Sequence, residues 1–491
     1  MPPRPENPRA YSGGVDAPVA AEAAVKIPPD STHYTHIHGA WYDLTNFSHP
    51  GGPVALSLAY GRDATVLFEQ SHVFTDRARL AALLAPLRAP PALCAALHAR
   101  FPRAAAEASC FDFDAAAATL GGGGCGDGGS GGAPPPPKED AFEAGLKALA
   151  RRHFAAEAAR RGVSVRAATK APLLRWAHFF ALLVVFLISV PPLLRGWWPA
   201  LLVTPTLCWI WMVNYWHDAA HFAMADSWLV NAALTYAAPW FSSPLIWYHQ
   251  HVIGHHAYTN IPGRDPDLYH APGLWRFSKD LRVRAAHGWQ AYTTPLLWLL
   301  SVPTLLLLKP LIALRTGVYN RVVALRALPP WRAALHICGR AAVFCSLYVW
   351  PFFAFPGDRV KALAFAVAPI AVYSGWFMAA SQPNHHSEDC RGEEGVSGCR
   401  VNWYRHQCAT SQTIAPGSEV AFWLSGGLNL QCEHHLLPTV NHWHLRALQP
   451  EVEALARAHG VPYPRSATIG EAFAKLWSYL RVMGRGADKE Q

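Results

Sequence analysis

The chain has 491 residues, of which 51% are hydrophobic and only 15% are Asp, Glu, Lys or Arg, whereas soluble proteins average about 25% charged residues. This shortage of charge excludes an ordinary soluble protein, and the mean hydropathy of +0.08 excludes a transporter that is buried throughout in lipid. The net charge of +9 comes from Lys and Arg residues that flank apolar runs, which is typical of membrane-flanking segments and argues against a nucleic-acid partner. The ten cysteines form no Cys-x-x-Cys pair and indicate reduced thiols.

The amino-terminal third of the chain divides by composition. Residues 1–30 are rich in Pro and Ala and lack the apolar stretch of a secretory signal, so we expect a disordered segment. Residues 31–88 have a mixed composition and are predicted to fold as a domain. Residues 89–137 are rich in Ala, Gly and Pro, which predicts a flexible linker. The remaining boundaries are a membrane part at 138–475, which begins with a helix, and a tail at 476–491.

Long uncharged runs predict the membrane part. Residues 177–194 and 197–216 carry no charge and are separated only by Arg195 and Gly196. Eighteen helical residues span roughly 27 Å, close to the hydrocarbon thickness of a bilayer. We therefore predict a helical hairpin here and a second one at about 333–357 and 362–381. The runs at 228–248 and 291–308 contain prolines and are predicted to be interfacial or re-entrant.

A pair of histidines marks the amino-terminal domain. His49 lies in the turn His-Pro-Gly-Gly, and His72 follows a helical stretch. Two neutral imidazoles on opposite faces of a haem give an iron suited to electron transfer. The string HPGG, then GRDAT, then FEQSH resembles the cytochrome b5 fold over roughly residues 30–85. The resemblance implies that His49 and His72 hold haem b.

Three further histidine clusters lie beside the predicted membrane helices. His217 and His221 are four residues apart at the end of a predicted crossing, and His251 and His255 repeat this spacing with His256 adjacent. On a helix, residues at i and i+4 lie on one face and can chelate one metal ion. The third cluster is Gln431-Cys432-Glu433-His434-His435. About eight ligands suit two metal ions side by side rather than one tetrahedral zinc.

These clusters resemble the histidine boxes of membrane fatty acid desaturases, which hold two non-haem iron ions. In the front-end subgroup the third box begins with Gln and a cytochrome b5 domain is fused at the amino terminus, as here. The fold class implied is an α+β cytochrome b5-like haem domain followed by an all-α integral membrane domain, with two transmembrane hairpins, interfacial helices and a cytosolic histidine-rich cap. The resemblance assigns as iron ligands His217, His221, His251, His255, His256, Gln431, His434 and His435. Asn384, His385 and His386 are expected to be ligands or to orient them. Asp218 and Glu433 are candidates to orient imidazoles, or are solvated carboxylates. Asp265 and Asp267 could orient imidazoles or cap a turn beside Pro266. Four other histidines, His249, His406, His442 and His444, are expected at the surface or in ordinary hydrogen bonds.

The resemblance implies an activity. The chain would insert a cis double bond between the carboxyl end of a polyunsaturated acyl chain and an existing double bond, with delta-5 favoured and delta-4 next. It would use O₂ and electrons passed from its haem domain, which we expect to swing on the linker and to be reduced by NADH through a cytochrome b5 reductase. The expected location is the endoplasmic reticulum membrane with the histidines and haem cytosolic, and the plastid envelope is the alternative.

Two other functions stay open at this point. A hydroxylase or a sphingolipid long-chain-base desaturase could be built from the same boxes, and product analysis would separate them. A membrane haem electron carrier, which is not an enzyme, would need only the amino-terminal half and would leave the three histidine clusters unexplained.

Overall fold

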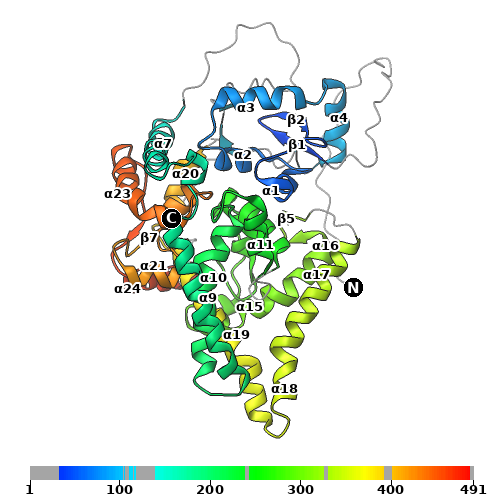
Figure 1. The fold of residues 1–491 in the computed structure, drawn as a ribbon, viewed down its shortest axis with the longest axis vertical. Coiled ribbons are helices and arrows are strands. Elements are labelled where there is room, and N and C mark those ends of the chain that lie inside the picture. Colours follow the sequence, from blue (N-terminus) through cyan, green and yellow to red (C-terminus); the bar gives the residue numbers. More distant parts are fainter. Residues whose placement is uncertain are drawn as a thin grey trace.

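The computed structural model shows a small α+β domain that rests on a larger helical domain (Figure 1). It describes residues 33–102, 104, 110–113, 116–117, 139–237, 243–325, 330–391 and 401–486. The expected disordered segment at 1–30 and the Gly-rich part of the linker at 121–137 lie outside the described residues.

The small domain is a hairpin of two strands surrounded by short helices. Strand β1 (Tyr34–Ile37) pairs antiparallel with β2 (Ala40–Asp43). Its helical elements are α1 (Gly52–Ala59), α2 (Thr65–Ser71), α3 (Arg77–Leu84), η1 (Ala85–Leu87) and α4 (Pro91–Arg100). Ile37, Tyr42 and Phe68 are buried together in its core, because alternate residues of the hairpin point inward against the helices.

The structure differs from the predicted linker at 89–137. Helix α4 buries Cys94 and Leu97 against Trp41 of β2, so the folded domain continues beyond residue 88. Further along, strand β3 (Phe111–Asp112) pairs in parallel with β6 (Val401–Asn402) of the larger domain. Composition missed both elements because an Ala-rich stretch can still bury a few large side chains.

The larger domain is almost entirely helical. Its first half contains α7 (Ala141–Arg161), α8 (Val165–Ala168), α9 (Leu173–Leu194), α10 (Ala200–Ala220), α11 (Trp228–Ala237), α12 (Pro244–Trp247), η2 (Tyr248–His255), α13 (His256–Tyr258), η3 (Pro266–Tyr269), η4 (Ala285–Trp289), α14 (Gln290–Leu299), α15 (Ser301–Pro303), η5 (Thr304–Leu308), α16 (Lys309–Thr316), β4 (Val318–Tyr319) and β5 (Val323–Ala324). Its second half contains α17 (Pro330–Phe344), η6 (Cys345–Val349), α18 (Trp350–Ala354), α19 (Arg359–Ser381), η7 (Gln382–Asn384), β6, α20 (Trp403–Thr410), β7 (Thr413–Ile414), α21 (Glu419–Ser425), α22 (Gln431–Leu436), α23 (His442–Ala458), β8 (Arg465–Ser466) and α24 (Ile469–Arg485).

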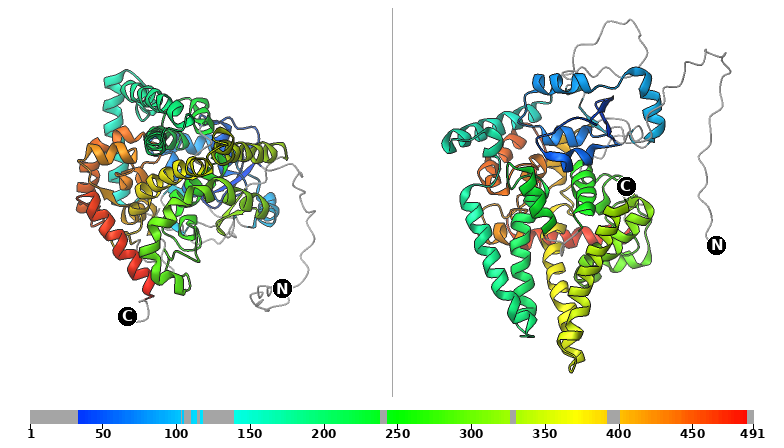
Figure 2. Two further views of the ribbon diagram at one scale, coloured as in Figure 1. Left: turned by 90° about the horizontal axis from the view of Figure 1, so that it is seen from below. Right: turned by 45° about the vertical axis from the view of Figure 1, so that its right-hand side comes forward.

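Two helical hairpins extend away from the small domain (Figures 1 and 2). In the described part of the chain, three helices are long and apolar enough to cross a membrane: Leu173–Leu194, Ala333–Ala354 and Arg359–Asn384. Helix α10 packs beside α9 and α19 but falls outside this set. The number of crossings therefore stays a prediction. The helices at 285–299 and 301–316 are bent by 64° at their junction, as a broken span or a re-entrant loop would be.

The carboxyl-terminal helices form a cap between the hairpins and the small domain. Helix α7, predicted at 138–166, is confirmed, and its Phe142, Leu146 and Phe154 join a core with α20, α22 and α23. The predicted tail at 476–491 is largely helical, because α24 continues to Arg485 and buries Leu476 and Leu480. The cap covers the ends of the membrane helices, where the histidine clusters lie.

Candidate functional site

Five histidines from three separate segments meet in a buried group. His217 and His221 come from the end of α10, His251 and His256 from η2 and α13, and His434 from α22, and their ligand nitrogens all lie within 4.8 Å of one another. The His217 and His251 Nε2 atoms are 2.8 Å apart. We call these five residues group one.

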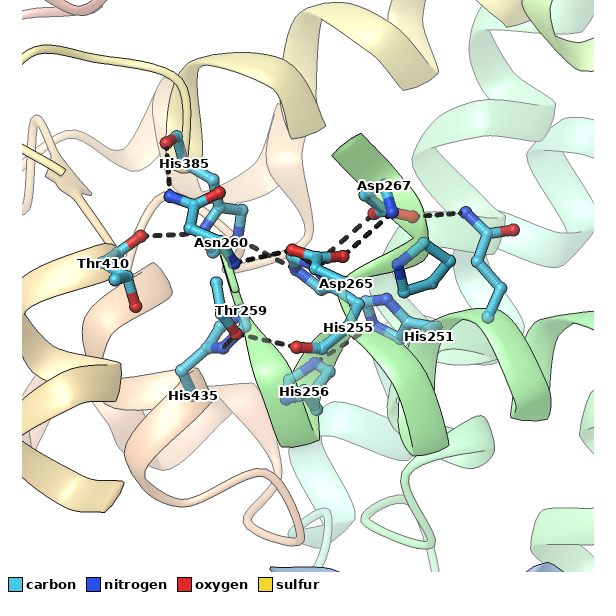
Figure 3. Close-up of polar contacts among 12 residues, drawn as sticks. His251, His255, His256, Thr259, Asn260, Asp265, Asp267, His385, Thr410 and His435 are labelled. Atoms are coloured by element: carbon cyan, nitrogen blue, oxygen red, sulfur yellow. Dashed lines mark hydrogen bonds and ion pairs between the residues drawn. The ribbon is translucent and has the colours of Figure 1, made fainter. Parts of the chain in front are cut away.

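A second buried group lies beside the first. It contains His255, His385 and His435, whose ligand nitrogens also lie within 4.8 Å of one another. The Nε2 atoms of His255 and His385 are 3.2 Å apart, and the rings of His256 and His435 stack at 4.1 Å between the two groups. We call these three residues group two (Figure 3).

The backbone of η2 changes the expected pairing. The i, i+4 spacing of His251 and His255 predicts that they share one ion, but His251 shares group one with His256, and His255 belongs to group two. Residues 248–255 form a π-helix, whose wider turn places i and i+5 on the same face. His251 and His255 therefore lie in different groups, which differs from the arrangement expected from their spacing, whereas His217 and His221 lie in the same group.

In group two, the Nδ1 atoms of His435 and His385 contact partners that orient the rings. The His435 Nδ1 atom lies 2.8 Å from Gln407 Oε1 and 3.1 Å from Thr259 Oγ1. His385 Nδ1 donates to the Thr410 carbonyl at 3.0 Å. These bonds place the proton on Nδ1, so that Nε2 carries the lone pair that can bind a metal ion.

The carboxylates of Asp265 and Asp267 lie beside the Nδ1 atom of His255. The His255 Nδ1 atom lies 3.3 Å from both oxygens of Asp265 and 3.6 Å from Asp267 (Figure 3). Burial opposes a charged imidazole here, but the two carboxylates overcome it and raise the pKa of His255 to about 8. Asp265 also caps the following turn by accepting from the Asp267 backbone N–H, so it has both of the roles considered from the sequence.

Asp218 contacts His442, a histidine expected at the surface or in an ordinary hydrogen bond. His442 is fully buried; its Nε2 lies 3.0 Å from His434 Nδ1, and its Nδ1 lies 2.7 Å from the Gly426 carbonyl and 3.3 Å from Asp218. Asp218 also accepts from Asn441 at 2.8 Å. A chain of contacts therefore runs from Asp218 through His442 to a group-one histidine. In the sequence, the Asn-His dipeptide at 441–442 is the feature that could have indicated a role for His442.

Gln431 and Asn384 border group two. The Gln431 Nε2 atom lies 3.0 Å from His385 Nε2, and its Oε1 accepts from Asn384 Nδ2 at 3.2 Å. Rotation of the Gln431 side-chain amide by 180° would exchange its two atoms and point Oε1 toward group two. His386 is buried but stacks on Phe277 at 4.1 Å and joins neither group.

Three of the histidines expected at the surface or in ordinary hydrogen bonds are buried and hydrogen-bonded. His249, His406 and His444 are at most 6% exposed, and each has a hydrogen bond to a backbone carbonyl. None of the three belongs to group one or group two. Glu433 is bonded to Thr413 and Tyr463 rather than to an imidazole, so its predicted role in orienting a ligand is not seen.

In the small domain, His49 and His72 face each other. Their ring centroids are 5.8 Å apart, and His72 Nδ1 donates to the Phe68 carbonyl at 2.8 Å, which leaves Nε2 free. Burial, with smaller contributions from His72 and Arg166, lowers the pKa of His49 to about 4. Both conditions suit neutral imidazole ligands on the two faces of a haem.

One pocket is lined both by the membrane helices and by histidines of both groups. Its apolar wall includes Trp209 and Met212 of α10 and Tyr373 and Phe377 of α19, so the two hairpins face each other across it. The other end is lined by His217, His251, His255 and His385. An apolar chain entering from the membrane side would therefore reach the histidines.

The donor atoms fit two metal ions. The Nε2 atoms of His221 and His435 are buried without a hydrogen-bond partner, one in each group. An unpartnered buried polar atom is costly, and a metal ion at each group would satisfy both atoms. Imidazole is a good ligand for iron.

Comparison with known proteins agrees with both halves of the chain. Residues 195–467 match the fatty acid desaturase family, and residues 22–88 match the cytochrome b5-like haem/steroid-binding domain. The chain is 26% identical over 485 residues to an acyl-lipid omega-13 desaturase of Chlamydomonas reinhardtii, covering 95% of this chain and 96% of that protein. It is 24% identical to a Delta(5) fatty acid desaturase of Dictyostelium discoideum, covering 92% and 90%. It is 29% identical to an acyl-lipid (8-3)-desaturase of Mortierella alpina, covering 55% and 61%.

With the family match covering more than half of the residues, this chain belongs to the fatty acid desaturase family and carries a cytochrome b5-like domain in front. It is a membrane-associated oxidoreductase whose cofactors are a haem and a di-iron centre. The prediction of a haem domain followed by a mostly helical desaturase domain is confirmed.

Proposed function

We propose that this chain is a front-end acyl-lipid desaturase, delta-5 before delta-4, that receives electrons from its own haem domain. The main support for this proposal is the pocket between the two hairpins, which is apolar at one end and lined by histidines of both groups at the other. The net reaction takes one acyl CH₂–CH₂ unit, O₂, two electrons and two protons to one CH=CH unit and two waters.

The proposed ligands follow the geometry. Group one, His217, His221, His251, His256 and His434, would hold one iron, and group two, His255, His385 and His435, would hold the other, with Gln431 beside it. When bound, the iron pair supplies the oxidising power of O₂ that an unactivated methylene requires, and the haem between His49 and His72 supplies electrons. Nδ1 contacts would hold the imidazoles of His255, His385, His434 and His435, and the pocket would keep water away from the acyl chain.

The relatives bear on regiospecificity. Their names include Delta(5), (8-3), (7-3) and omega-13 desaturases. Delta-5 and delta-4 enzymes count from the carboxyl end, whereas an omega name counts from the methyl end, and on one chain length both can describe the same bond. We propose that this chain places the double bond at a fixed distance from the carboxyl end, as the name of the Delta(5) relative states for that protein. The haem domain would be reduced by NADH through a cytochrome b5 reductase. The proposed location is the endoplasmic reticulum membrane with the haem domain cytosolic, and the plastid envelope is the alternative.

Yeast fed polyunsaturated acids of several chain lengths would test the regiospecificity. A new double bond at a constant distance from the carboxyl group supports the proposal, and one at a constant distance from the methyl end contradicts it. A hydroxylated acid or a modified long-chain base would instead favour the two related enzyme classes.

Two variants would test the assignment of cofactors. His434→Ala removes one nitrogen from group one, so we expect desaturation to disappear while the haem absorbance stays. His49→Ala should remove the haem band and leave the non-haem iron in place. Retained product after His434→Ala would contradict the iron assignment.

A further inference from the structure

The turn at residues 49–52 of the small domain, which carries the proposed haem ligand His49, contacts Arg166 and Trp228 of the larger domain. Arg166, just before the first membrane helix, donates from Nη2 to the Pro50 carbonyl at 3.2 Å and to the Asp226 carbonyl at 2.9 Å. Its Nε pairs with the Asp226 carboxylate at 2.8 Å. Asp226 thus holds the guanidinium in place, and the guanidinium holds the residue next to His49.

Trp228 packs on the same turn from the other side. A Cβ atom at Gly52 would lie 2.3 Å from Trp228 Cδ2, and Gly52 has a φ of +78°. The indole therefore approaches the backbone of the turn more closely than any side chain at residue 52 would allow. Arg166, Asp226 and Trp228 together form what we call the seat.

The segment 111–113 contacts both domains at a second place. Phe111 is 1% exposed and lies against Tyr258 and His406 of the larger domain, with ring centroids at 6.2 and 5.3 Å. Phe113 is 6% exposed and meets His38 of the small domain edge-on at 6.0 Å. Strand β3 fixes this segment to β6. We call Phe111 and Phe113 the aromatic pin.

Between the seat and the pin, the small domain packs directly on the helix that carries metal-site histidines. Leu58 of α1 is buried in one cluster with Tyr248, Val252 and Ile253 of η2, and Leu67 packs against it. The small domain lies above this part of the larger domain in Figure 1 and in the right-hand view of Figure 2. Seat and pin hold the haem domain over η2 from two points.

We propose that Arg166, Trp228, Phe111 and Phe113 are positioning residues that hold the haem domain in one docked arrangement for electron delivery, in place of a donor that swings freely on its linker. The inference rests on the proposed function, because it concerns how electrons reach the di-iron centre. A docked donor removes the search that a tethered domain must otherwise make for each electron.

Rapid mixing of the full-length enzyme would test this. The haem is reduced without O₂ in the presence of acyl substrate, and its reoxidation is followed after O₂ is added, with His434→Ala giving the background rate. We expect Trp228→Ala, Arg166→Ala and the double variant Phe111→Ala/Phe113→Ala to slow reoxidation roughly tenfold or more. Their haem band and non-haem iron content should stay unchanged.

Matched controls separate docking from general damage. Arg160→Ala removes an arginine that is 70% exposed and pairs with Glu157, and Trp289→Ala removes a tryptophan that is 67% exposed beside Tyr292. Both controls should reoxidise like the wild type. Amide hydrogen exchange gives a second measurement: α1 should exchange faster in Trp228→Ala than in Arg160→Ala.

The outcomes are distinguishable. Seat and pin variants that reoxidise within about twofold of the wild type, with unchanged exchange in α1, would overturn the docking proposal alone. A wild-type rate no faster than that of His434→Ala would overturn both the docking proposal and the proposed electron route. Slow reoxidation with an intact haem band and faster exchange in α1 would support docking.

Discussion

His442 shows how a residue outside the recognised motifs can control a metal site. It is buried, it contacts His434 Nδ1, and Asp218 and the Gly426 carbonyl hold its other nitrogen. For His434 to bind a metal ion through Nε2, its proton must lie on Nδ1 and be accepted by His442 Nε2. His442 therefore sets both the tautomer and the orientation of a proposed ligand.

We expect His442→Ala to lower the iron content and the activity about 10- to 100-fold, which is the usual cost of removing a group that orients a ligand. Elemental analysis of non-haem iron per haem measures this directly. His442→Gln should restore part of the iron because an amide oxygen can also accept from Nδ1. The control is His459→Ala, and iron content equal to the wild type in His442→Ala would refute the role.

At the scale of the element, the π-helix η2 decides how the ligands are shared. Its wide turn sends His251 to group one and His255 to group two. The helix needs close support on its outer side: a Cβ atom at Gly254 would lie 2.7 Å from Pro266 and 2.8 Å from Val323. Neither neighbour is a long flexible side chain that could move aside.

Gly254→Ala should therefore displace η2 from Pro266, at a cost of ~1–3 kcal/mol of stability, and reduce non-haem iron without loss of the haem band. Thermal unfolding and iron analysis measure the two effects. Gly339→Ala, on α17 with open space around it, is the matched control: it should leave the iron content unchanged and should not lower the stability. Full iron loading in Gly254→Ala would show that η2 tolerates the shift.

At the scale of the whole molecule, the haem domain lies at one end and the two hairpins extend to the other (Figure 2, right). The histidine groups lie on the side of the haem domain, because η2 packs against α1. Exposed apolar side chains cover the hairpins, among them Ile188, Leu202 and Phe353. Such a surface is stable only in lipid. We therefore expect both hairpin turns to lie across the membrane from the catalytic end.

Two engineered cysteines would test this arrangement in sealed microsomes. Gly357→Cys lies in the turn between α18 and α19, and Gly417→Cys lies in the cap, both at positions with open space for a side chain. A thiol reagent that cannot cross the membrane should label Gly417→Cys at once and Gly357→Cys only after permeabilisation, above the background of the unaltered chain. Equal labelling of both before permeabilisation would refute the hairpin topology.

The sequence by itself determined the chemistry of this protein. Local patterns carry that information: the His-Pro-Gly-Gly turn marks His49, uncharged runs mark the hairpins, and the clusters at 217–221, 251–256 and 431–435 supply the imidazoles. Each pattern depends only on residues close together in the chain, so it can be read without the fold.

Only the tertiary structure decided how these residues are combined. The π-helix separates His255 from His251, His385 arrives from the end of α19 to complete group two, and His442 is brought to His434 from the start of α23. Composition likewise indicated a free linker, while Phe111 is buried between domains by contacts with residues far along the chain. These features depend on packing and helix geometry between distant segments, which no local pattern specifies.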